Sequence, residues 1–482
     1  MPNAIVWFRN DLRLRDNPAL NAALRAGLTP IPVYIHAPHE EGDWVPGAAS
    51  DAWRHRSLHA LDTDLRVRGS QLHVFRGNSS RILQMLLAET NAKAIFWNRR
   101  YEPFIQQRDA DIKRDLRALG IRAESFNGSL LFEPWELQTK TGDPFRVFAP
   151  FWRAARAQWR LAPVTEAPHR FPASTAGPSS IGIDALGLAP RVRWDSGFWT
   201  EFTPGEAGAQ RALKIFADDA AVSLYRSARD IPSVRGTSKL SPHLHFGEIS
   251  PARIVHELER TGAGAALDLE AYVRELGWRE FAHHVLHHFP HTPQRNFNPR
   301  FDRFAWAEVS MQTLRAWQQG RTGVPIVDAG LRELWTTGWM HNRVRMIVAS
   351  FLTKNLRLHW LHGARWFWET LVDADLANNS LGWQWVAGTG VDAAPYFRVF
   401  NPILQARKFD PEGNYIARWV PELAEAPSAA RIEPWRHKAA PLPGVDPYPR
   451  QPMVDLLASR ERAIAAFSAC SHRPATNEHL SR

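Results

Sequence analysis

Five short apolar runs lie within residues 1–132 and alternate with segments of helical period. The runs are residues 4–8, 31–35, 71–75, 94–97 and 122–126, and residues 80–89 and 105–119 are two of the helical segments. Strands that alternate with helices of this length predict an α/β domain with a parallel sheet. No G-x-G-x-x-G follows the first run, so the usual dinucleotide fingerprint is missing and any ligand would bind this domain differently.

Helical period dominates the second half of the chain. Ile326, Gly330 and Leu334 recur at i, i+4 and i+8 behind Pro325, which suits a first helical turn, and residues 344–352 carry the next apolar stripe. Residues 160–205, between the halves, are rich in Pro, Ala, Ser and Gly, which is typical of a linker. We therefore predict an α/β domain over 1–132, a connector over 133–205 and an all-helical domain over 206–482.

Charge adds a candidate partner. The net charge of +10 and the pI near 10 favour a polyanion such as nucleic acid, because clustered Lys and Arg neutralise phosphates, although a basic pI can also serve solubility alone. The chain has 21 tryptophans, ten of them between Trp278 and Trp385, which by itself indicates only a large aromatic core.

Several compositional features bear on where the protein works. The single cysteine, Cys470, excludes an intramolecular disulfide and a Cys-ligated iron–sulfur cluster. No apolar run approaches the ~20 residues of a transmembrane helix, and the N-terminus lacks the features of a secretory signal. We expect a cytoplasmic protein without membrane contact.

Three constellations could carry chemistry. The segment 236–242 (GTSKLSP) sets three hydroxyls and a lysine before a helix that we expect Ser241 to cap, which suits either a phosphate site or a plain capped loop. Glu275, Trp278 and Arg279 share one helical face, which fits either a surface ion pair beside a tryptophan or a stacking site for a flipped base. Asn342, Arg345 and Met346 share a second face, a mixture that a core helix rarely needs.

We expect no metal site in this sequence. Asp373 and Asp375 could bind a metal, act as acid and base, or accept hydrogen bonds from a ribose, but no His or Cys lies nearby in sequence. The histidines at 283, 284, 287 and 288 superficially resemble a zinc-binding helix, yet the typical intervening glutamate is missing.

Long motifs in the right order resemble the photolyase/cryptochrome family from about residue 4 to about residue 450. They are the segments 7–17 (WFRNDLRLRDN), 236–242, 338–346 (GWMHNRVRM), 373–385 (DADLANNSLGWQW) and 392–401 (DAAPYFRVFN). The resemblance implies light-driven repair of cyclobutane pyrimidine dimers in UV-damaged DNA, by an electron from excited, fully reduced FAD. It also implies an alternative, a blue-light photoreceptor of the cryptochrome type that binds FAD without repair.

The resemblance also implies roles for particular residues. FAD contacts are expected from Tyr225, Thr237, Ser238, Lys239, Leu240, Ser241, Tyr272, Glu275, Arg279, Trp339, Asn342, Arg345, Asp373, Asp375 and Asn379. Trp278, Met346 and Trp385 would contact the lesion, Glu275 and Asn342 would hydrogen-bond its bases, and Arg229, Arg343 and Arg398 would hold phosphates. Asn379 would face the flavin N5, and Trp383, Trp360 and Trp306 would form an electron-transfer chain that runs from the flavin to the surface.

Some positions discriminate between branches of the family. Asn379, where plant-type cryptochromes typically carry Asp, and Asn342 with Met346, where enzymes for (6-4) photoproducts usually carry His, favour repair of cyclobutane pyrimidine dimers. We expect the protein to be a monomer. Tyr272, Arg274 and Lys239 depart from well-known bacterial members and favour a class III enzyme. An antenna chromophore is expected in the α/β domain, with 5,10-methenyltetrahydrofolate ahead of 8-hydroxy-5-deazaflavin, although residues 101–105 lack the Asn-Glu pair that binds folate in some members.

Overall fold

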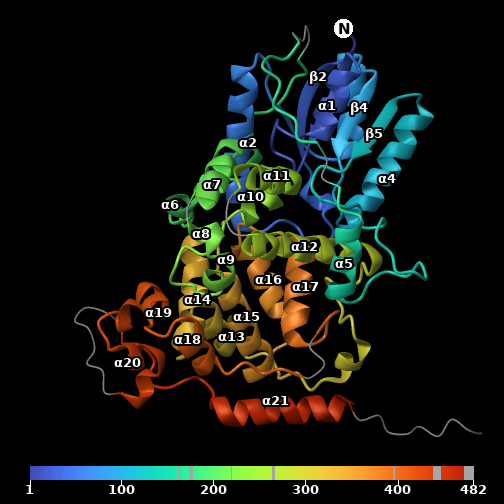
Figure 1. Ribbon diagram of the computed structural model, residues 1–482. Coiled ribbons are helices and arrows are strands. Elements are labelled where there is room, and N and C mark those ends of the chain that lie inside the picture. Colours follow the sequence, from blue (N-terminus) through green and yellow to red (C-terminus); the bar gives the residue numbers. More distant parts are fainter. Residues whose placement is uncertain are drawn as a thin grey trace, which may run out of the picture.

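The apolar runs near the N-terminus form one parallel sheet in the order β3-β2-β1-β4-β5 (Figure 1). The computed structural model describes residues 1–160, 163–172, 177–218, 220–262, 266–393, 397–437 and 447–471. The strands are β1 (Asn3–Phe8), β2 (Thr29–His36), β3 (His73–Arg76), β4 (Ala94–Asn98) and β5 (Arg122–Phe126). The predicted α/β class is confirmed, and only β3 begins two residues later than its apolar run, which starts at 71.

Alternate residues of β1 enter two different cores. Val6 and Phe8 pack on one side of the sheet, and Ile5 and Trp7 pack on the other, as the two-residue period of a strand requires. Both faces are buried, which explains why the strands read as continuous apolar runs. The helices of this part are α1 (Pro18–Arg25), α2 (Ala48–Val67), α3 (Ser79–Thr90) and α4 (Pro103–Ala118).

The predicted connector contains helices α5 (Phe148–Ala157) and α6 (Phe198–Glu201). Phe148, Phe151 and Trp152 of α5 pack in the same core as Tyr272 and Phe281 of α12 (Ala266–His288). Although the predicted boundary falls at 206, α5 therefore shares its core with the helical part. Residues 161–162 and 173–176 of the predicted linker lie outside the described residues.

The rest of the chain is helical, and none of its described residues forms a strand. The Pro325 stripe is α14, with the proline at its start, and the next stripe is α15 followed by a π-helical turn at Phe351–Asn355. The remaining helices are α7 (Glu206–Asp218), α8 (Ala220–Ser223), α9 (Tyr225–Ala228), α10 (Ser241–His245), α11 (Pro251–Thr261), α13 (Met311–Gln318), α14 (Pro325–Thr337), α15 (Asn342–Ser350), α16 (Trp360–Thr370), α17 (Leu376–Ala387), α18 (Pro402–Phe409), α19 (Asn414–Trp419), α20 (Ser428–Ile432) and α21 (Leu456–Ser471).

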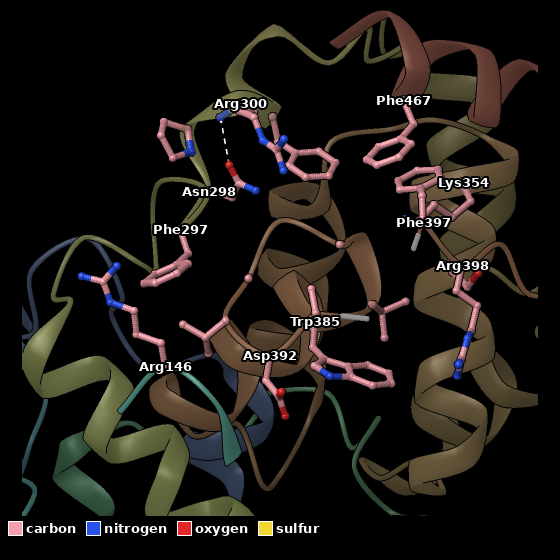
Figure 2. A pocket seen from close by; sticks show the side chains of 18 of the residues that line it. Arg146, Phe297, Asn298, Arg300, Lys354, Trp385, Asp392, Phe397, Arg398 and Phe467 are labelled. Atoms are coloured by element: carbon pink, nitrogen blue, oxygen red, sulfur yellow. Dashed lines mark hydrogen bonds between the residues drawn. The ribbon is translucent and has the colours of Figure 1, made fainter. Parts of the chain in front are cut away.

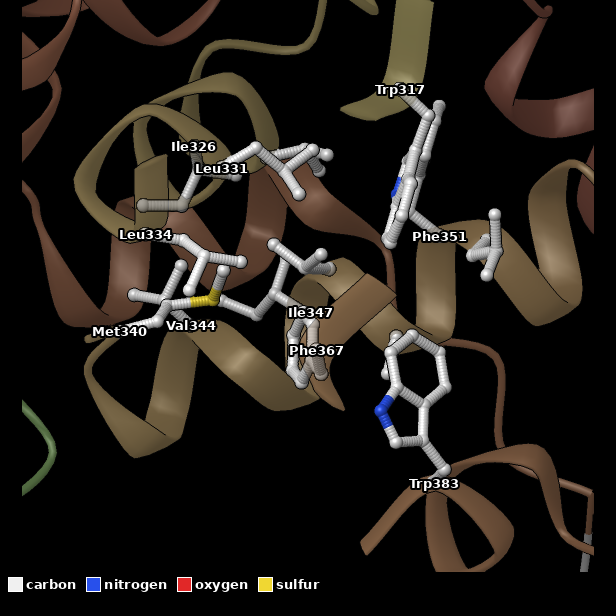
Figure 3. Close-up of a cluster of buried hydrophobic side chains, with 14 of the residues drawn as sticks. Trp317, Ile326, Leu331, Leu334, Met340, Val344, Ile347, Phe351, Phe367 and Trp383 are labelled. Carbon is white, nitrogen blue, oxygen red and sulfur yellow. The ribbon is translucent and has the colours of Figure 1, made fainter. Parts of the chain in front are cut away.

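The largest apolar core lies among α13–α17 (Figure 3). Met340, Val344 and Ile347 face α14, Phe367 lies beside Ile347, and Trp317, Phe351 and Trp383 lie on the opposite side of the cluster. This packing fixes α15 and α17, which carry many of the predicted site residues. Among the described residues, no helix combines the length and the apolar content needed to cross a membrane.

Candidate functional site

The loop before α10 meets α9 and α12 through tyrosines. The Tyr272 hydroxyl donates a hydrogen bond to Ser238 Oγ at 3.1 Å, and the rings of Tyr225 and Tyr272 contact edge to face with centroids 5.2 Å apart. Both tyrosines are buried. The structure therefore brings Tyr225, Tyr272 and the hydroxyl loop together, although they lie on three separate segments.

The expected capping of α10 by Ser241 is wrong. Leu240 occupies the capping position, no side chain caps this helix, and Ser241 is its first residue. Its hydroxyl instead accepts a hydrogen bond from Trp339 Nε1 at 3.2 Å. Lys239 adopts a φ of +52° and donates to Glu201 Oε2 at 2.5 Å, so its charge is already paired. The loop presents hydroxyls, with its lysine turned to a carboxylate.

A cavity of about 420 Å³ adjoins this loop. Thr237, Ser238, Lys239 and Trp339 line it together with His243, Glu333 and other residues of α7, α14 and α19. Burial raises the pKa of the Glu333 carboxyl to about 7, against hydrogen bonds from Tyr415 and the His341 amide. Four of the predicted cofactor residues therefore line this cavity. The Glu333 carboxyl, in the same lining, has a pKa near neutral pH.

Arg345 and Asp373, two of the expected FAD contacts, form an ion pair. Arg345 Nη2 lies 2.7 Å from Asp373 Oδ2, and its Nε donates to the Met340 carbonyl at 2.8 Å. The Asp373 side chain is 3% exposed, and its Oδ1 has no hydrogen-bond partner. A buried carboxylate oxygen without a donor is costly, so this atom fits a ligand that offers an N–H or O–H group.

Asp375 caps α17 and lies between two histidines. Its Oδ1 accepts from the Asn378 backbone and side-chain N–H groups at 2.8 and 2.7 Å, and its Oδ2 lies 3.5 Å from His283 Nε2 and 3.9 Å from His245 Nδ1. Burial opposes ionisation, but the neighbouring His283 and His245 hold the Asp375 pKa well below its usual value. An anionic carboxylate is thus fixed at the start of α17.

The face of α17 after Asp375 carries Asn379 and Trp383. Asn379 Nδ2 donates to the Ala364 carbonyl of α16 at 3.0 Å, which fixes the orientation of the amide. Trp383 is 2% exposed, and its Nε1 has no hydrogen-bond partner. A Cβ on Gly363 would lie 2.0 Å from the Trp383 ring, so α16 needs a glycine where this indole crosses it.

The other two predicted electron-transfer tryptophans lie on either side of His359. The Trp306 and His359 rings are 5.0 Å apart, and the His359 and Trp360 rings are 5.6 Å apart. Trp360 is fully buried and donates from Nε1 to Asn296 Oδ1 at 2.9 Å, whereas Trp306 is half-buried. Gly363, where the Trp383 indole crosses α16, lies one turn after Trp360 on the same helix. Trp383 and Trp360 therefore lie along α16, and Trp306 lies beside His359, just before its first residue.

Glu275 and Trp278 lie on α12 as predicted, and each has a partner outside it. Trp278 stacks on Phe148 of α5 with ring centroids 3.8 Å apart and planes inclined by 10°. Glu275 Oε1 forms a short ion pair with Arg229 Nη1. Arg274, one of the departures from the family pattern, lies with its guanidinium 5.4 Å from the Phe148 ring centroid.

Arg279 contacts the segment that follows β5 of the α/β part. Its Nη1 donates to the Ser129 carbonyl at 2.7 Å and lies 3.5 Å from Glu280 Oε1. Glu280 Oε2 accepts from the backbone N–H groups of Leu131 and Phe132 at 2.8 and 3.1 Å. The two residues together attach the segment after β5 to α12.

The start of α15 presents a mixed polar face. Asn342, its first residue, is exposed, and Met346 lies one turn further on. Arg343 donates to Asp230 Oδ2 at 2.7 Å and lies 3.7 Å from the Met346 sulfur. Arg343 and Arg229 therefore both have carboxylate partners in the free protein.

Figure 2 shows a larger cavity, of about 690 Å³, with Trp385 in its wall. Arg398 lies on the far side from Arg146, and both guanidinium groups belong to the lining. Lys354 is buried there, lies 3.2 Å from the Phe397 ring centroid and donates to the Ala387 carbonyl, and burial lowers its pKa well below the usual value. Residues 394–396 of the 392–401 motif lie outside the described residues.

The histidine cluster of α12 is used for packing and hydrogen bonds. His284 Nδ1 and His288 Nε2 lie 2.9 and 3.1 Å from the Pro134 carbonyl, and His284 Nε2 accepts from the Phe145 amide at 2.9 Å. Burial lowers the pKa of His284 to about 4. These histidines tie the connector to the helical part.

The carboxyl ends of the strands leave little room for a ligand. The order of the strands reverses between β1 and β4, where doubly wound sheets usually bind ligands. The cavity there measures only about 20 Å³. Arg9 pairs with Asp109 across it, Arg108 pairs with Glu40, and both guanidinium groups lie about 5 Å from the Trp7 ring centroid. Arg100 pairs with Glu102, which therefore already has a partner.

Sequence reasoning missed three residues that support the predicted site. Phe148 stacks on Trp278, Asp230 pairs with Arg343, and His245 flanks Asp375. Each contact joins segments more than 100 residues apart, so no local pattern could signal it. His245 alone carried a hint, because it ends the helix that the hydroxyl loop begins.

The chain belongs to the photolyase/cryptochrome family. Residues 4–173 match the model for DNA photolyase, and residues 272–469 match the model for the FAD binding domain of DNA photolyase. The helical part is therefore an FAD-binding domain of the photolyase type. The chain is 45% identical to a deoxyribodipyrimidine photo-lyase of Agrobacterium fabrum over 96% of this chain and 97% of that one.

The chain is also similar to a solved photolyase structure and to a plant cryptochrome. The crystal structure of a class III photolyase from Agrobacterium tumefaciens superimposes with a TM-score of 0.92 at 44% identity and covers 98% of each chain. Cryptochrome-2 of Arabidopsis thaliana is 37% identical over 96% of this chain and 78% of its own length.

Proposed function

We propose that this protein is a deoxyribodipyrimidine photo-lyase that uses light to split cyclobutane pyrimidine dimers in UV-damaged DNA. The observation that carries the proposal is the likeness over almost the full length to a photo-lyase and to a class III photolyase structure. The departures at Tyr272, Arg274 and Lys239 place it, within this proposal, in class III.

The predicted site residues that lie on or next to α9, α10, α12, α15 and α17 suit FAD. They offer hydroxyls on the loop 237–241, an indole at Trp339, a cation at Arg345 and the unpartnered Asp373 Oδ1, which together match a ligand with phosphates, a ribityl chain and a ring N–H. When bound and reduced, FAD supplies an electron to the dimer under blue light and takes it back after the ring has split.

The chain's own groups hold and tune that site. Arg345 is fixed by Asp373 and Met340, so a positive charge stays beside a reduced flavin without reorganisation. Asn379 is oriented by Ala364, and Asp375 is kept ionised by its histidines. These groups set charge and orientation, while the redox chemistry remains that of the flavin.

A flipped dimer would meet a mixed aromatic and polar wall. Trp278, held by Phe148, and Trp385, in the wall of the larger cavity, supply stacking surfaces, and Met346 supplies an apolar contact. Glu275 and the exposed Asn342 supply hydrogen bonds to the bases. Arg229, Arg343 and Arg398 supply cations for the flanking phosphates.

Blue-light repair of a thymine-dimer oligonucleotide tests this function. The reduced protein is mixed with the damaged strand, and recovery of the base absorption band is compared in light and in darkness. Light-dependent recovery with repeated turnover is expected. A yellow, photoreducible protein that restores no absorption would contradict repair and favour a blue-light receptor of the cryptochrome type.

For the antenna we propose a folate, 5,10-methenyltetrahydrofolate, in preference to 8-hydroxy-5-deazaflavin. The crevice at the strand ends is filled by Arg9, Arg108 and Trp7, so a planar deazaflavin has no room there. Glu102 is paired with Arg100, so the folate would use other residues than the 101–105 segment. Extraction of the purified protein and identification of the released chromophore by mass tests this choice.

A further inference from the structure

Two histidines of α2 face one carboxylate of the connector. His55 and His59 lie one helical turn apart, and their Nε2 atoms lie 2.9 and 3.0 Å from Asp184 Oδ1. Their rings contact edge to face with centroids 4.7 Å apart. The three possible ligand atoms all lie within 4.8 Å of one another, and no other trio of His, Cys, Asp or Glu in the described part of the chain is so arranged.

The two elements that carry these side chains are held in place independently of them. Trp53 and Leu58 of α2 pack in the same core as Ile183 and Leu186, which flank Asp184 in the short 3-10 helix Ile183–Leu186. An isolated β-bridge joins Val74 to Ile181 just before this helix. The side-chain cluster is therefore built on rigid supports, which metal sites require.

The ligand atoms lie at the edge of this contact. The Asp184 side chain is 82% exposed, that of His59 47% and that of His55 20%. An ion can therefore reach them from solvent and keep water in its remaining positions. The exposed Asp184 carboxylate can also rotate, which allows the ligand spacing to adjust.

We propose that His55, His59 and Asp184 form a binding site for a divalent transition metal of the Zn²⁺ type. Two imidazole nitrogens at i and i+4 plus one carboxylate oxygen are a donor set that such ions favour, at bond lengths of about 2.0–2.2 Å. Tetrahedral bonds of this length separate ligand atoms by about 3.3 Å, close to the separations already present. Mg²⁺ and Ca²⁺ prefer all-oxygen sites and fit poorly.

The metal would replace two hydrogen bonds. Without it, each Nε2 carries the proton and donates to Asp184; with it, each Nε2 turns its lone pair to the ion and the proton moves to Nδ1. The site joins α2 to the connector, 125 residues further along the chain. The expected role of the bound metal ion is to hold the connector against the α/β part.

Zinc binding to the full-length, FAD-loaded protein tests this site. Protein without a histidine tag is freed of metal with a chelator and titrated calorimetrically with Zn²⁺. One Zn²⁺ per chain in the strongest class of sites is expected for the wild type. His59→Ala and Asp184→Asn should each weaken that class at least tenfold, whereas His39→Ala, an exposed histidine outside the cluster, should not.

Each variant replaces an exposed side chain, and retained FAD absorbance establishes that each variant is folded. The proposal is overturned if His59→Ala and Asp184→Asn bind Zn²⁺ with the affinity and stoichiometry of the wild type. It is equally overturned if the wild type binds no Zn²⁺ at micromolar concentration, because the trio is then only a hydrogen-bonded contact. Mg²⁺ should fail to compete in the same titration.

Discussion

At the scale of single residues, Trp278 owes its position to a stacking partner from another helix. Phe148 fixes one indole face at 3.8 Å, so Trp278 is preorganised to contact a base. Trp278→Ala should cost about 1–3 kcal/mol of affinity for dimer-containing DNA, the usual value of one base-stacking contact, while FAD is retained. Fluorescence anisotropy with a damaged oligonucleotide measures this loss.

Trp335→Ala is the matched control for Trp278→Ala. Trp335 is 52% exposed and stacks on Trp194 and Trp366, away from the predicted lesion residues. Its removal should leave damaged-DNA affinity unchanged. Equal losses in the two variants would show that the assigned pocket is wrong.

Gly363 decides how closely Trp383 approaches α16. A Cβ there would lie 2.0 Å from the indole, so Gly363→Ala must displace the ring and should destabilise the protein by about 1–3 kcal/mol. If Trp383 conducts electrons to the flavin, photoreduction in the presence of an external reductant should slow. Gly382→Ala, an exposed position of α17 with nothing within 4 Å of its Cβ, should leave photoreduction unchanged and should not destabilise the protein. Unchanged photoreduction in Gly363→Ala would argue against this role for Trp383.

At the scale of elements, apolar patterning predicted the strands and the main helices well. Continuous apolar runs marked strands buried on both faces, and the Pro325 stripe marked α14, because these signals are local. The predicted cap of α10 was wrong, since Ser241 is the first residue of the helix and its hydroxyl accepts from Trp339. The role of α5 stayed hidden because its partners on α12 lie far along the chain.

Many of the predicted site residues converge in space, but only the resemblance to the family could assign them. The Arg345–Asp373 pair and the proximity of Tyr272 to Ser238 follow from packing, which no spacing in sequence reveals. Arg279 shows that residues on one helical face can have partners in different parts of the protein. It shares the helical face of Glu275 and Trp278, yet its side chain contacts Ser129 and Glu280.

Glu280 makes the attachment of α12 to the α/β part depend on pH. Burial raises its pKa from 4.5 to about 7, against Arg279, His283 and two backbone hydrogen bonds. A carboxyl whose folded pKa is raised stabilises the protein fully below pH 4.5, and this contribution is lost as pH rises through 7. Wild type and Glu280→Gln should therefore be similar in stability near pH 4.5, and Glu280→Gln should be more stable by about 3 kcal/mol at pH 8.

Urea unfolding of the FAD-loaded proteins across this pH range measures the difference. Glu259→Gln, at an exposed position of α11, is the matched control and should follow the wild type at every pH. A constant difference between wild type and Glu280→Gln would mean that the pKa of Glu280 is not raised in the folded state.

At the scale of the whole molecule, the net charge of +10 attracts DNA without specifying where it binds. Two of the predicted phosphate-binding cations are masked in the free protein, because Arg229 pairs with Glu275 and Arg343 pairs with Asp230. A phosphate must compete with these carboxylates. This arrangement weakens the attraction of these cations to DNA phosphates, damaged or not, while it keeps the cations in place.

The salt dependence of DNA binding separates local contacts from overall charge. If Arg343 contacts one phosphate, Arg343→Ala should reduce the slope of log K against log salt by about 0.9 on duplex DNA. Arg25→Ala, on α1, removes the same charge from an exposed position in the α/β part and should barely change the slope (Figure 1). Asp230→Asn should strengthen binding to damaged and undamaged DNA alike, since it frees Arg343 without altering base contacts. Equal slopes for Arg343→Ala and Arg25→Ala would mean that only net charge matters and that Arg343 lies outside the interface.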